Sequence, residues 1–229
     1  MNIGFIGTGL MGAPMIKNLL KSKHQISIFN RTISKAKKLK KYGAYLSYKI
    51  EELVKDKEII ITMLTDDKAV NDIIRSKTFL NNVCKQTTVI DMSSTKPSTA
   101  LDNYKTLKKR GVYFLDAPVS GGTKGAESAS LAIMVGGEKK IYKKNLKVLK
   151  MLGIPNYVGK PSSGQAAKLA NQIIVGITIG AVSEAIILSK KLGLKPTNVL
   201  KALKGGWADS KILQTHGLRM IKEDFKARG

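Results

Sequence analysis

The stretch GFIGTGLMG, from Gly4 to Gly12, lies at the very start of the chain and contains a G-x-G-x-x-G pattern. Glycine hexamers arise by chance, so this one is informative only if a strand precedes it and a helix follows it. Residues 2–6 form a short apolar run suited to a buried strand, and residues 11–20 are typical of a helix. The stretch therefore predicts the strand–turn–helix unit of a dinucleotide-binding fold. A plain glycine turn is the alternative.

Each glycine of the pattern has a predicted task. Gly7 makes the tight turn, Gly9 lets the backbone approach a pyrophosphate, and Gly12 allows the helix to pack closely on the strand. We expect the phosphates at the N-terminus of the helix, where free N–H groups and the helix dipole favour negative charge.

Strand and helix patterns alternate from residue 2 to about residue 151. The expected strands are 2–6, 25–30, 58–62, 87–91, 112–117 and 132–135, and the expected helices are 11–20, 32–42, 66–75, 97–110 and 138–151. Thr32 is expected to cap the second of these helices, and Gly43 to stop it. The alternation predicts a Rossmann-type, doubly wound and mostly parallel sheet with helices on both faces.

The pattern changes after Pro161. One long apolar helix is expected at 164–192, followed by helices at about 196–203 and 208–226. We therefore predict a nucleotide-binding domain at residues 1–160 and a helical substrate or dimerisation domain at 161–229. A G-x-x-x-G pattern inside the long helix predicts close approach of another helix, from the same chain or from a second subunit.

The composition is that of a globular, intracellular protein. Hydrophobic residues make up 43% of the 229, and the single cysteine excludes an intrachain disulfide. No basic residue precedes Lys17, so no secretory signal is expected. The longest apolar run, 173–182, is shorter than the roughly 20 residues of a membrane span. We expect a cytoplasmic location, no membrane contact and no metal site.

The net charge of +24 is the most unusual bulk property. A strong positive field attracts nucleic acids and other anionic surfaces. However, nearly all the basic residues are lysines spread from end to end, and no RNA-binding aromatic motif or zinc-finger spacing is present. The charge therefore favours solvated lysine-rich helix faces over specific nucleic-acid binding.

The end of the second expected strand indicates which dinucleotide is bound. An NAD site usually has an acidic residue there, which accepts hydrogen bonds from the ribose 2′-OH. This chain has Asn30, Arg31 and Thr32 instead. Arg31 offers a charged, planar group to a 2′-phosphate, which favours NADP(H) and leaves NAD(H) possible. Alternatively, Arg31 is an ordinary surface residue and Thr32 only a helix cap.

Two later segments predict a reacting site. The turn Ser120-Gly121-Gly122 follows an apolar strand, and its exposed N–H groups could bind a carboxylate; a flexible turn is the alternative. Lys168 lies near the start of the long apolar helix, where the helix dipole is expected to lower its pKa and suit it to proton transfer. For an isolated lysine, an ordinary half-exposed side chain would be the better interpretation.

Taken together, these segments resemble the β-hydroxyacid dehydrogenases, which include 3-hydroxyisobutyrate dehydrogenase, tartronate semialdehyde (2-hydroxy-3-oxopropionate) reductase and glyoxylate or succinic semialdehyde reductases. The matching segments are GFIGTGLMGAPM, ITMLTDD, DMSSTKP, DAPVSGG with the later IMVGG, and GQAAKLANQ, which follow one another from residue 4 to about residue 190. Several segments in order are far more specific than the glycine hexamer alone.

The resemblance implies a role for each matching residue. Lys168 corresponds to the catalytic lysine, which protonates the carbonyl oxygen while the nicotinamide delivers hydride. Asn171 corresponds to a polar residue that orients the substrate, and Gln172 to a neighbouring position that is Asn in some members. The implied substrate-carboxylate residues are Ser120, Gly121 and Gly122. The implied cofactor residues are Gly7, Thr8, Gly9, Leu10, Met11, Gly12, Asn30, Arg31, Thr32, Met63, Leu64 and Ser94.

The sequence also departs from the family pattern. Full members are expected to continue through further helices, with a Lys-Asp pair that closes the site, whereas this sequence stops after Asp224-Phe225-Lys226 and three more residues. We expect a shortened helical domain, with a second subunit of a dimer or tetramer completing the wall or with weakened activity.

The sequence thus favours an NADP-preferring oxidoreductase that interconverts a small 3-hydroxy acid and its semialdehyde. A non-catalytic, cofactor-binding relative that acts as a binding module is the alternative. A 6-phosphogluconate dehydrogenase is a third possibility, but it needs a longer helical domain and a Lys-x-x-His-Asn pattern that is not present.

Overall fold

The computed structural model describes residues 1–226, which form two compact units. The first unit runs from Met1 to Lys168, and the second begins at Leu169. The predicted domain boundary at residue 160 lies a few residues before this division, and it stays a prediction.

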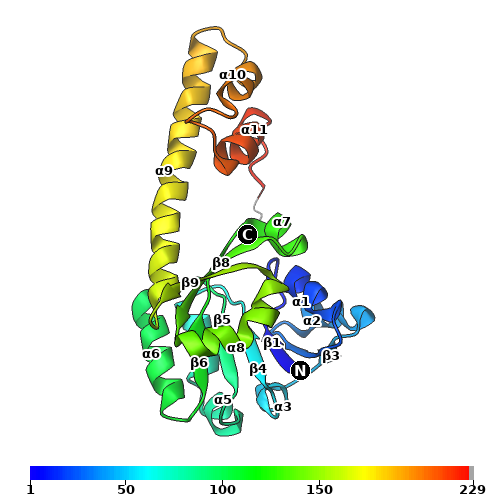
Figure 1. The fold of residues 1–229 in the computed structure, drawn as a ribbon. Helices are drawn as coiled ribbons and strands as arrows, with labels where there is room; N and C mark the ends of the chain where they lie inside the picture. Colours follow the sequence, from blue (N-terminus) through cyan, green and yellow to red (C-terminus); the bar gives the residue numbers. More distant parts are fainter. Residues whose placement is uncertain (227–229) are drawn as a thin grey trace. The chain divides into compact units, whose positions relative to one another are not determined.

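A mixed sheet of nine strands forms the centre of the first unit (Figure 1). The strands are β1 (Asn2–Ile6), β2 (Gln25–Phe29), β3 (Tyr45–Leu46), β4 (Ile59–Thr62), β5 (Thr88–Asp91), β6 (Tyr113–Asp116), β7 (Val119–Ser120), β8 (Leu131–Gly137) and β9 (Gly153–Gly159). Their order is β3-β2-β1-β4-β5-β6-β8-β7, and β9 pairs with β8. The strands from β3 to β6 pair in parallel, whereas β8 is antiparallel to β6 and β7. This is the Rossmann order of strands with an antiparallel extension.

Helices cover both faces of this sheet. They are α1 (Gly12–Leu20), α2 (Ile33–Lys37), η1 (Lys40–Tyr42), α3 (Ile50–Val54), α4 (Asp67–Ile74), α5 (Lys77–Asn82), α6 (Pro97–Lys108), α7 (Gly122–Glu127) and α8 (Lys139–Lys150). Strand β4 shows the two faces directly. Ile59 and Ile61 belong to one buried cluster, and Ile60 between them belongs to another. Because alternate side chains point to opposite faces, both faces are buried, and the predicted doubly wound fold is confirmed.

Several short elements differ from the sequence prediction. The helix expected at 32–42 is split into α2 and η1, and Thr32 makes no side-chain cap hydrogen bond, so that part of the prediction is wrong. Gly43 does end the segment in the left-handed conformation. The unpredicted strand β9 contains Pro155, which normally argues against a strand. It is tolerated because β9 pairs only with β8 among the described strands.

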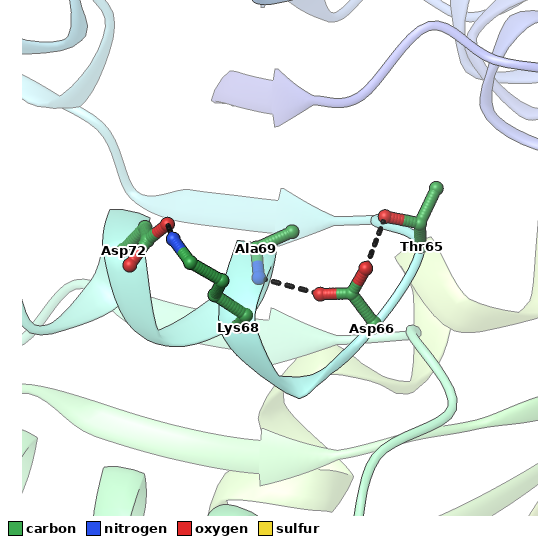
Figure 2. Close-up of polar contacts among 5 residues, drawn as sticks. All are labelled: Thr65, Asp66, Lys68, Ala69 and Asp72. Atoms are coloured by element: carbon green, nitrogen blue, oxygen red, sulfur yellow. Dashed lines mark hydrogen bonds and ion pairs between the residues drawn. The ribbon is translucent and has the colours of Figure 1, made fainter.

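The turn after β4 is fixed by a helix cap (Figure 2). The Asp66 carboxylate accepts a 2.8 Å hydrogen bond from the backbone N–H of Ala69 and a 3.0 Å bond from the Thr65 hydroxyl. These bonds lower the pKa of Asp66, the Ala69 bond most strongly. Within α4, Lys68 pairs with Asp72, one turn later. The cap therefore defines where the chain leaves β4 and enters α4.

The second unit has a small core of its own. Helix α9 (Ser163–Lys191) begins in the first unit and supplies Val182 and Ile186 to this core. The helices α10 (Pro196–Leu203), η2 (Leu213–Gly217) and α11 (Leu218–Ile221) complete it. The helix predicted at 208–226 is shorter and less regular than expected: the chain is helical from 211 to 221, and the π-helical turn η2 lies within this segment.

Much of α9 is apolar and exposed. A side chain added at Gly176 or Gly180 would meet no atom within 4 Å in the described residues, so the close helix approach predicted there is not made within this part of the chain. The length of α9 and the mean hydropathy of 1.8 over an 18-residue window within it would suit a membrane span, although long core helices of soluble proteins have the same properties. The absence of membrane contact and the homo-oligomer therefore stay predictions.

Candidate functional site

The glycine turn between β1 and α1 is held against the end of β2. The N–H of Gly7 donates to the carbonyl oxygen of Phe29 at 3.0 Å, and the N–H of Thr8 donates to the side-chain oxygen of Asn30 at 2.9 Å. The Asn30 amide also donates to the carbonyl oxygen of Thr32. Asn30 thus orders the turn itself, and its side chain is occupied by protein partners.

The three glycines of the turn differ in what surrounds them. A side chain at Gly7, whose φ is +102°, would collide with the carbonyl oxygen of Met63, and one at Gly12 would collide with the carbonyl oxygen of Gly7. A side chain at Gly9 would meet nothing within 4 Å in the described chain. Two glycines therefore allow close packing, and Gly9 leaves open space in front of the turn.

The N-terminus of α1 suits an anion. Within the described residues no side chain caps this helix, and its first turn holds no acidic residue. Its N-terminal N–H groups and dipole therefore have no protein anion to pair with. Together with the open space at Gly9, this matches the shape and charge of a dinucleotide pyrophosphate. Leu10 and Met11 complete the turn, and Leu10 is 65% exposed.

The end of β2 presents two exposed side chains, Arg31 and Thr32. Among residues 1–226, Arg31 forms no hydrogen bond or ion pair with protein. Its guanidinium group is therefore available to a ligand.

Two further loops lie beside the glycine turn. Met63 and Leu64 follow β4 and contact Gly7. The N–H of Leu64 donates to the hydroxyl of Ser93 at 2.9 Å, so the loops after β4 and β5 are joined. Ser93 is buried, whereas Ser94, the predicted cofactor residue, is exposed.

The Ser-Gly-Gly turn follows directly on Val119. Ser120 ends β7, and Gly121 and Gly122 both have positive φ, +139° and +60°. Glycine adopts these conformations at little cost. Both glycines are exposed at the start of α7.

Lys168 is the side chain that the structure brings to this turn. Its ammonium nitrogen donates a 2.8 Å hydrogen bond to the carbonyl oxygen of Val119, the residue before Ser120. The side chain is half-buried, and burial lowers the pKa of Lys168. The sequence predicted this direction, but from the helix dipole. The two segments predicted to form the reacting site therefore meet.

Asn171 and Gln172 lie further along α9, in the second unit. Asn171 donates a 2.9 Å side-chain hydrogen bond to Gln172. This contact does not distinguish which amide would bind substrate.

Two buried side chains at this site were not predicted from sequence. Asp116 ends β6 and accepts hydrogen bonds from the backbone N–H groups of Ser162 and Gln165, both at 2.9 Å. Gln165 donates to the carbonyl oxygen of Ser93 and accepts from the N–H of Thr95. Both lie inside segments that matched the family, Asp116 at the start of DAPVSGG and Gln165 within GQAAK. An acidic residue closing a buried strand was the signal that could have identified the first.

Comparison with known proteins supports a dinucleotide-binding enzyme. Residues 2–186 match the family described as the NAD binding domain of 6-phosphogluconate dehydrogenase. Residues 162–229 match the NAD-binding domain of NADP-dependent 3-hydroxyisobutyrate dehydrogenase. The chain is 39% identical over 232 residues to 2-hydroxy-3-oxopropionate reductase of Escherichia coli K12, covering 98% of this chain and 77% of the relative.

Solved structures show the same fold. A 3-hydroxyisobutyrate dehydrogenase from Mycobacterium tuberculosis with L-serine superimposes with a TM-score of 0.86 at 31% identity, covering 93% of this chain and 73% of that one. Psf3 in complex with NADP+ and 2-OPP superimposes with a TM-score of 0.90 at 24% identity, covering 96% and 79%. The second likeness concerns the fold alone.

Proposed function

This chain belongs to the β-hydroxyacid dehydrogenase family of oxidoreductases, and we propose that it interconverts a small 3-hydroxy acid and its semialdehyde with NADP(H). The observation that carries the proposal is the hydrogen bond from Lys168 to Val119, which holds a half-buried ammonium group beside an exposed Ser-Gly-Gly turn.

The glycine turn supports dinucleotide binding. Its uncapped helix N-terminus would pair with the pyrophosphate, and the open space at Gly9 would admit it. At the adenosine end, the exposed guanidinium of Arg31 would bind a 2′-phosphate, and no acidic residue stands at 30–32 to repel one. This supports a preference for NADP(H) over NAD(H). When bound, the cofactor supplies or accepts the hydride.

The residues of the first unit would handle the proton and the substrate carboxylate. Ser120, Gly121 and Gly122 would bind the carboxylate through the hydroxyl and backbone N–H groups. Lys168 would donate a proton to the carbonyl oxygen during reduction and accept it during oxidation. Its bond to Val119 fixes one of three ammonium protons and leaves the others for substrate. Asn171 or Gln172 would orient the substrate.

The substrate class follows from these groups. A carboxylate anchor and a proton donor on a neighbouring segment suit a short acid that carries an aldehyde or ketone. The relatives named for 2-hydroxy-3-oxopropionate and 3-hydroxyisobutyrate act on molecules of this kind, which supports the same class here.

The experiment is a substrate panel. NADPH or NADH oxidation by the purified protein is followed with tartronate semialdehyde, succinic semialdehyde, methylmalonate semialdehyde and glyoxylate. We expect turnover of at least one acid with NADPH, and slower turnover with NADH. If no acid is turned over while NADPH still binds, the protein is a cofactor-binding relative and the proposal is wrong.

A further inference from the structure

The start of helix α9 is fastened to strand β6 by one carboxylate. The two oxygens of Asp116 each accept a 2.9 Å hydrogen bond, one from the N–H of Ser162 and one from the N–H of Gln165. Asp116 is fully buried, so water cannot replace either bond. Gln165 lies in the first turn of α9, where an N–H group has no intrahelical acceptor, and Ser162 immediately precedes the helix.

The backbone around Asp116 is closely packed. A side chain at Gly136, on β8, would come within 2.5 Å of an Asp116 carboxylate oxygen. A side chain at Gly164, on α9, would come within 2.5 Å of the Asp116 carbonyl oxygen and would also collide with that of Met134. Strands β6 and β8 and the start of α9 therefore meet by direct backbone packing around Asp116.

Gln165 makes a second attachment on the same turn. Its amide donates to the carbonyl oxygen of Ser93 at 2.8 Å, and its oxygen accepts from the N–H of Thr95 at 3.1 Å. The side chain is 1% exposed. These two residues flank Ser94, so Gln165 ties α9 to the loop that carries a proposed cofactor contact.

The attachments lie one helical turn from Lys168. Gln165 precedes Lys168 by three residues on α9, and Asp116 precedes Val119 by three residues on the β6–β7 segment. The two segments are joined at one end by the Asp116–Gln165 bond and at the other by the Lys168–Val119 bond. Movement at the first joint would therefore be transmitted to the lysine.

We propose that Asp116 and Gln165 are positioning residues, which hold Lys168 at a fixed place relative to the Ser-Gly-Gly turn and the cofactor loop. The inference rests on the proposed role of Lys168. Its physical reason is that a displacement of about 1 Å at a reacting group costs roughly 100-fold in rate. Neither residue touches substrate in this scheme, and each acts through the lysine.

The chemistry of Asp116 agrees with this assignment. Burial raises the pKa of its carboxyl to about 6, so keeping it ionised at neutral pH is costly. An ionised carboxylate makes shorter and stronger hydrogen bonds to N–H groups than a neutral amide does. Stronger hydrogen bonds hold the start of α9 more firmly against β6.

The test compares Asp116→Asn with Asp91→Asn. Asp91 is a buried carboxylate directly opposite Asp116 on the neighbouring strand β5, but within residues 1–226 its hydrogen bonds go to Thr62 and Ser93 and not to α9. We expect Asp116→Asn to lower kcat by about ten- to hundredfold while the Kd for NADPH changes less than about twofold. We expect Asp91→Asn to leave kcat within about threefold. Equal kcat values for the two variants would overturn the proposal.

A second variant covers the case in which Asp116→Asn does not fold. Gln165→Met keeps the length of the side chain and removes both hydrogen bonds without leaving a buried charge. We expect the same result as for Asp116→Asn: a lower kcat and an unchanged Kd for NADPH. A wild-type kcat in a folded Gln165→Met protein would contradict the assignment for Gln165.

A chemical readout separates this inference from the proposed function. Acetylation of Lys168 by acetic anhydride, followed by mass spectrometry of its peptide, reports the exposure and pKa of the amine without any turnover. We expect the acetylation rate to change by about threefold or more in Asp116→Asn and Gln165→Met but not in Asp91→Asn. If the wild-type protein reduces no acid, the proposed function is wrong, but the acetylation rate of Lys168 still tests whether Asp116 and Gln165 position it. An unchanged rate in both variants would overturn it.

Discussion

The ammonium group of Lys168 donates a hydrogen bond of 2.8 Å to the carbonyl oxygen of Val119, which lies 49 residues earlier in the chain. This contact joins the start of α9 to the strand that ends at Ser120. It places the proposed proton donor beside the proposed carboxylate site.

Arg31→Ala should weaken NADPH binding and leave NADH binding nearly unchanged. A charge-assisted hydrogen bond to a phosphate contributes about 1.5–3 kcal/mol, or roughly ten- to hundredfold in Kd. Fluorescence titration of both cofactors measures the two constants. Arg110→Ala is the control, because Arg110 bonds to the carbonyl oxygen of Leu80 and lies outside the proposed site. An equal loss for NADH and NADPH would show that Arg31 does not read the 2′-phosphate.

Gly9→Ala should weaken cofactor binding, whereas Gly7→Ala should lower the stability of the fold. The methyl group at Gly9 meets open space in the protein, so the variant should keep its melting temperature and bind NADPH less tightly, by about 1–3 kcal/mol, because the methyl crowds the pyrophosphate. Gly7→Ala meets the carbonyl of Met63 at positive φ and should lose about 1 kcal/mol or more of folding free energy. Thermal melts and cofactor titrations distinguish the two. Tight NADPH binding by Gly9→Ala would place the pyrophosphate elsewhere.

Asp91 should make the folded protein less stable as the pH rises. Burial raises its pKa to about 6 in the folded state, above the ordinary 3.8 expected when unfolded. The folded state therefore binds this proton more tightly, and its stabilising effect is complete below about pH 4 and lost as the pH passes about 6. The difference in unfolding free energy between wild type and Asp91→Asn should shift by up to about 3 kcal/mol over that interval, in favour of the variant. Urea unfolding at several pH values measures it. A constant difference would show that Asp91 does not titrate there.

The two directions of the reaction should depend oppositely on pH. Reduction needs the ammonium form of Lys168 and oxidation needs the free amine, so kcat should fall for reduction and rise for oxidation as the pH passes the pKa of Lys168. Burial places that pKa below its ordinary value of 10.5. Initial rates in both directions, taken from about pH 6 to pH 10, test this. The same slope in both directions would exclude Lys168 as the proton-transfer group.

The sequence was sufficient for those features that depend on neighbouring residues. The glycine turn, the mostly parallel strands β1, β2, β4, β5 and β6, and the long helix α9 follow from local patterns of apolar residues and glycines, whereas the two-residue strand β3 was not predicted. The predicted side-chain cap at Thr32 is not formed, and the helix that follows it is only five residues long. Strand β9 was missed because its proline and flanking glycines mask an edge strand.

The joint between Asp116 and Gln165 could not be predicted, because it depends on contacts across 49 residues. In the sequence each residue is one polar position among several. Their importance arises only when β6 and α9 bring a buried carboxylate to the unpaired N–H groups of a helix. In the same way, Lys168 and Ser120 were predicted separately, and the fold supplies the contact through Val119.

The most direct test of the account is kcat for NADPH-dependent reduction by Lys168→Ala, measured beside Lys147→Ala, which alters an exposed lysine on α8 outside the site. General acid catalysis contributes about 10²- to 10⁴-fold, so kcat should fall by that factor with an unchanged Kd for NADPH, and added ethylammonium should restore part of the rate. Lys147→Ala should match wild type. A Lys168→Ala protein that keeps the wild-type kcat would contradict the assignment of Lys168 as the proton donor.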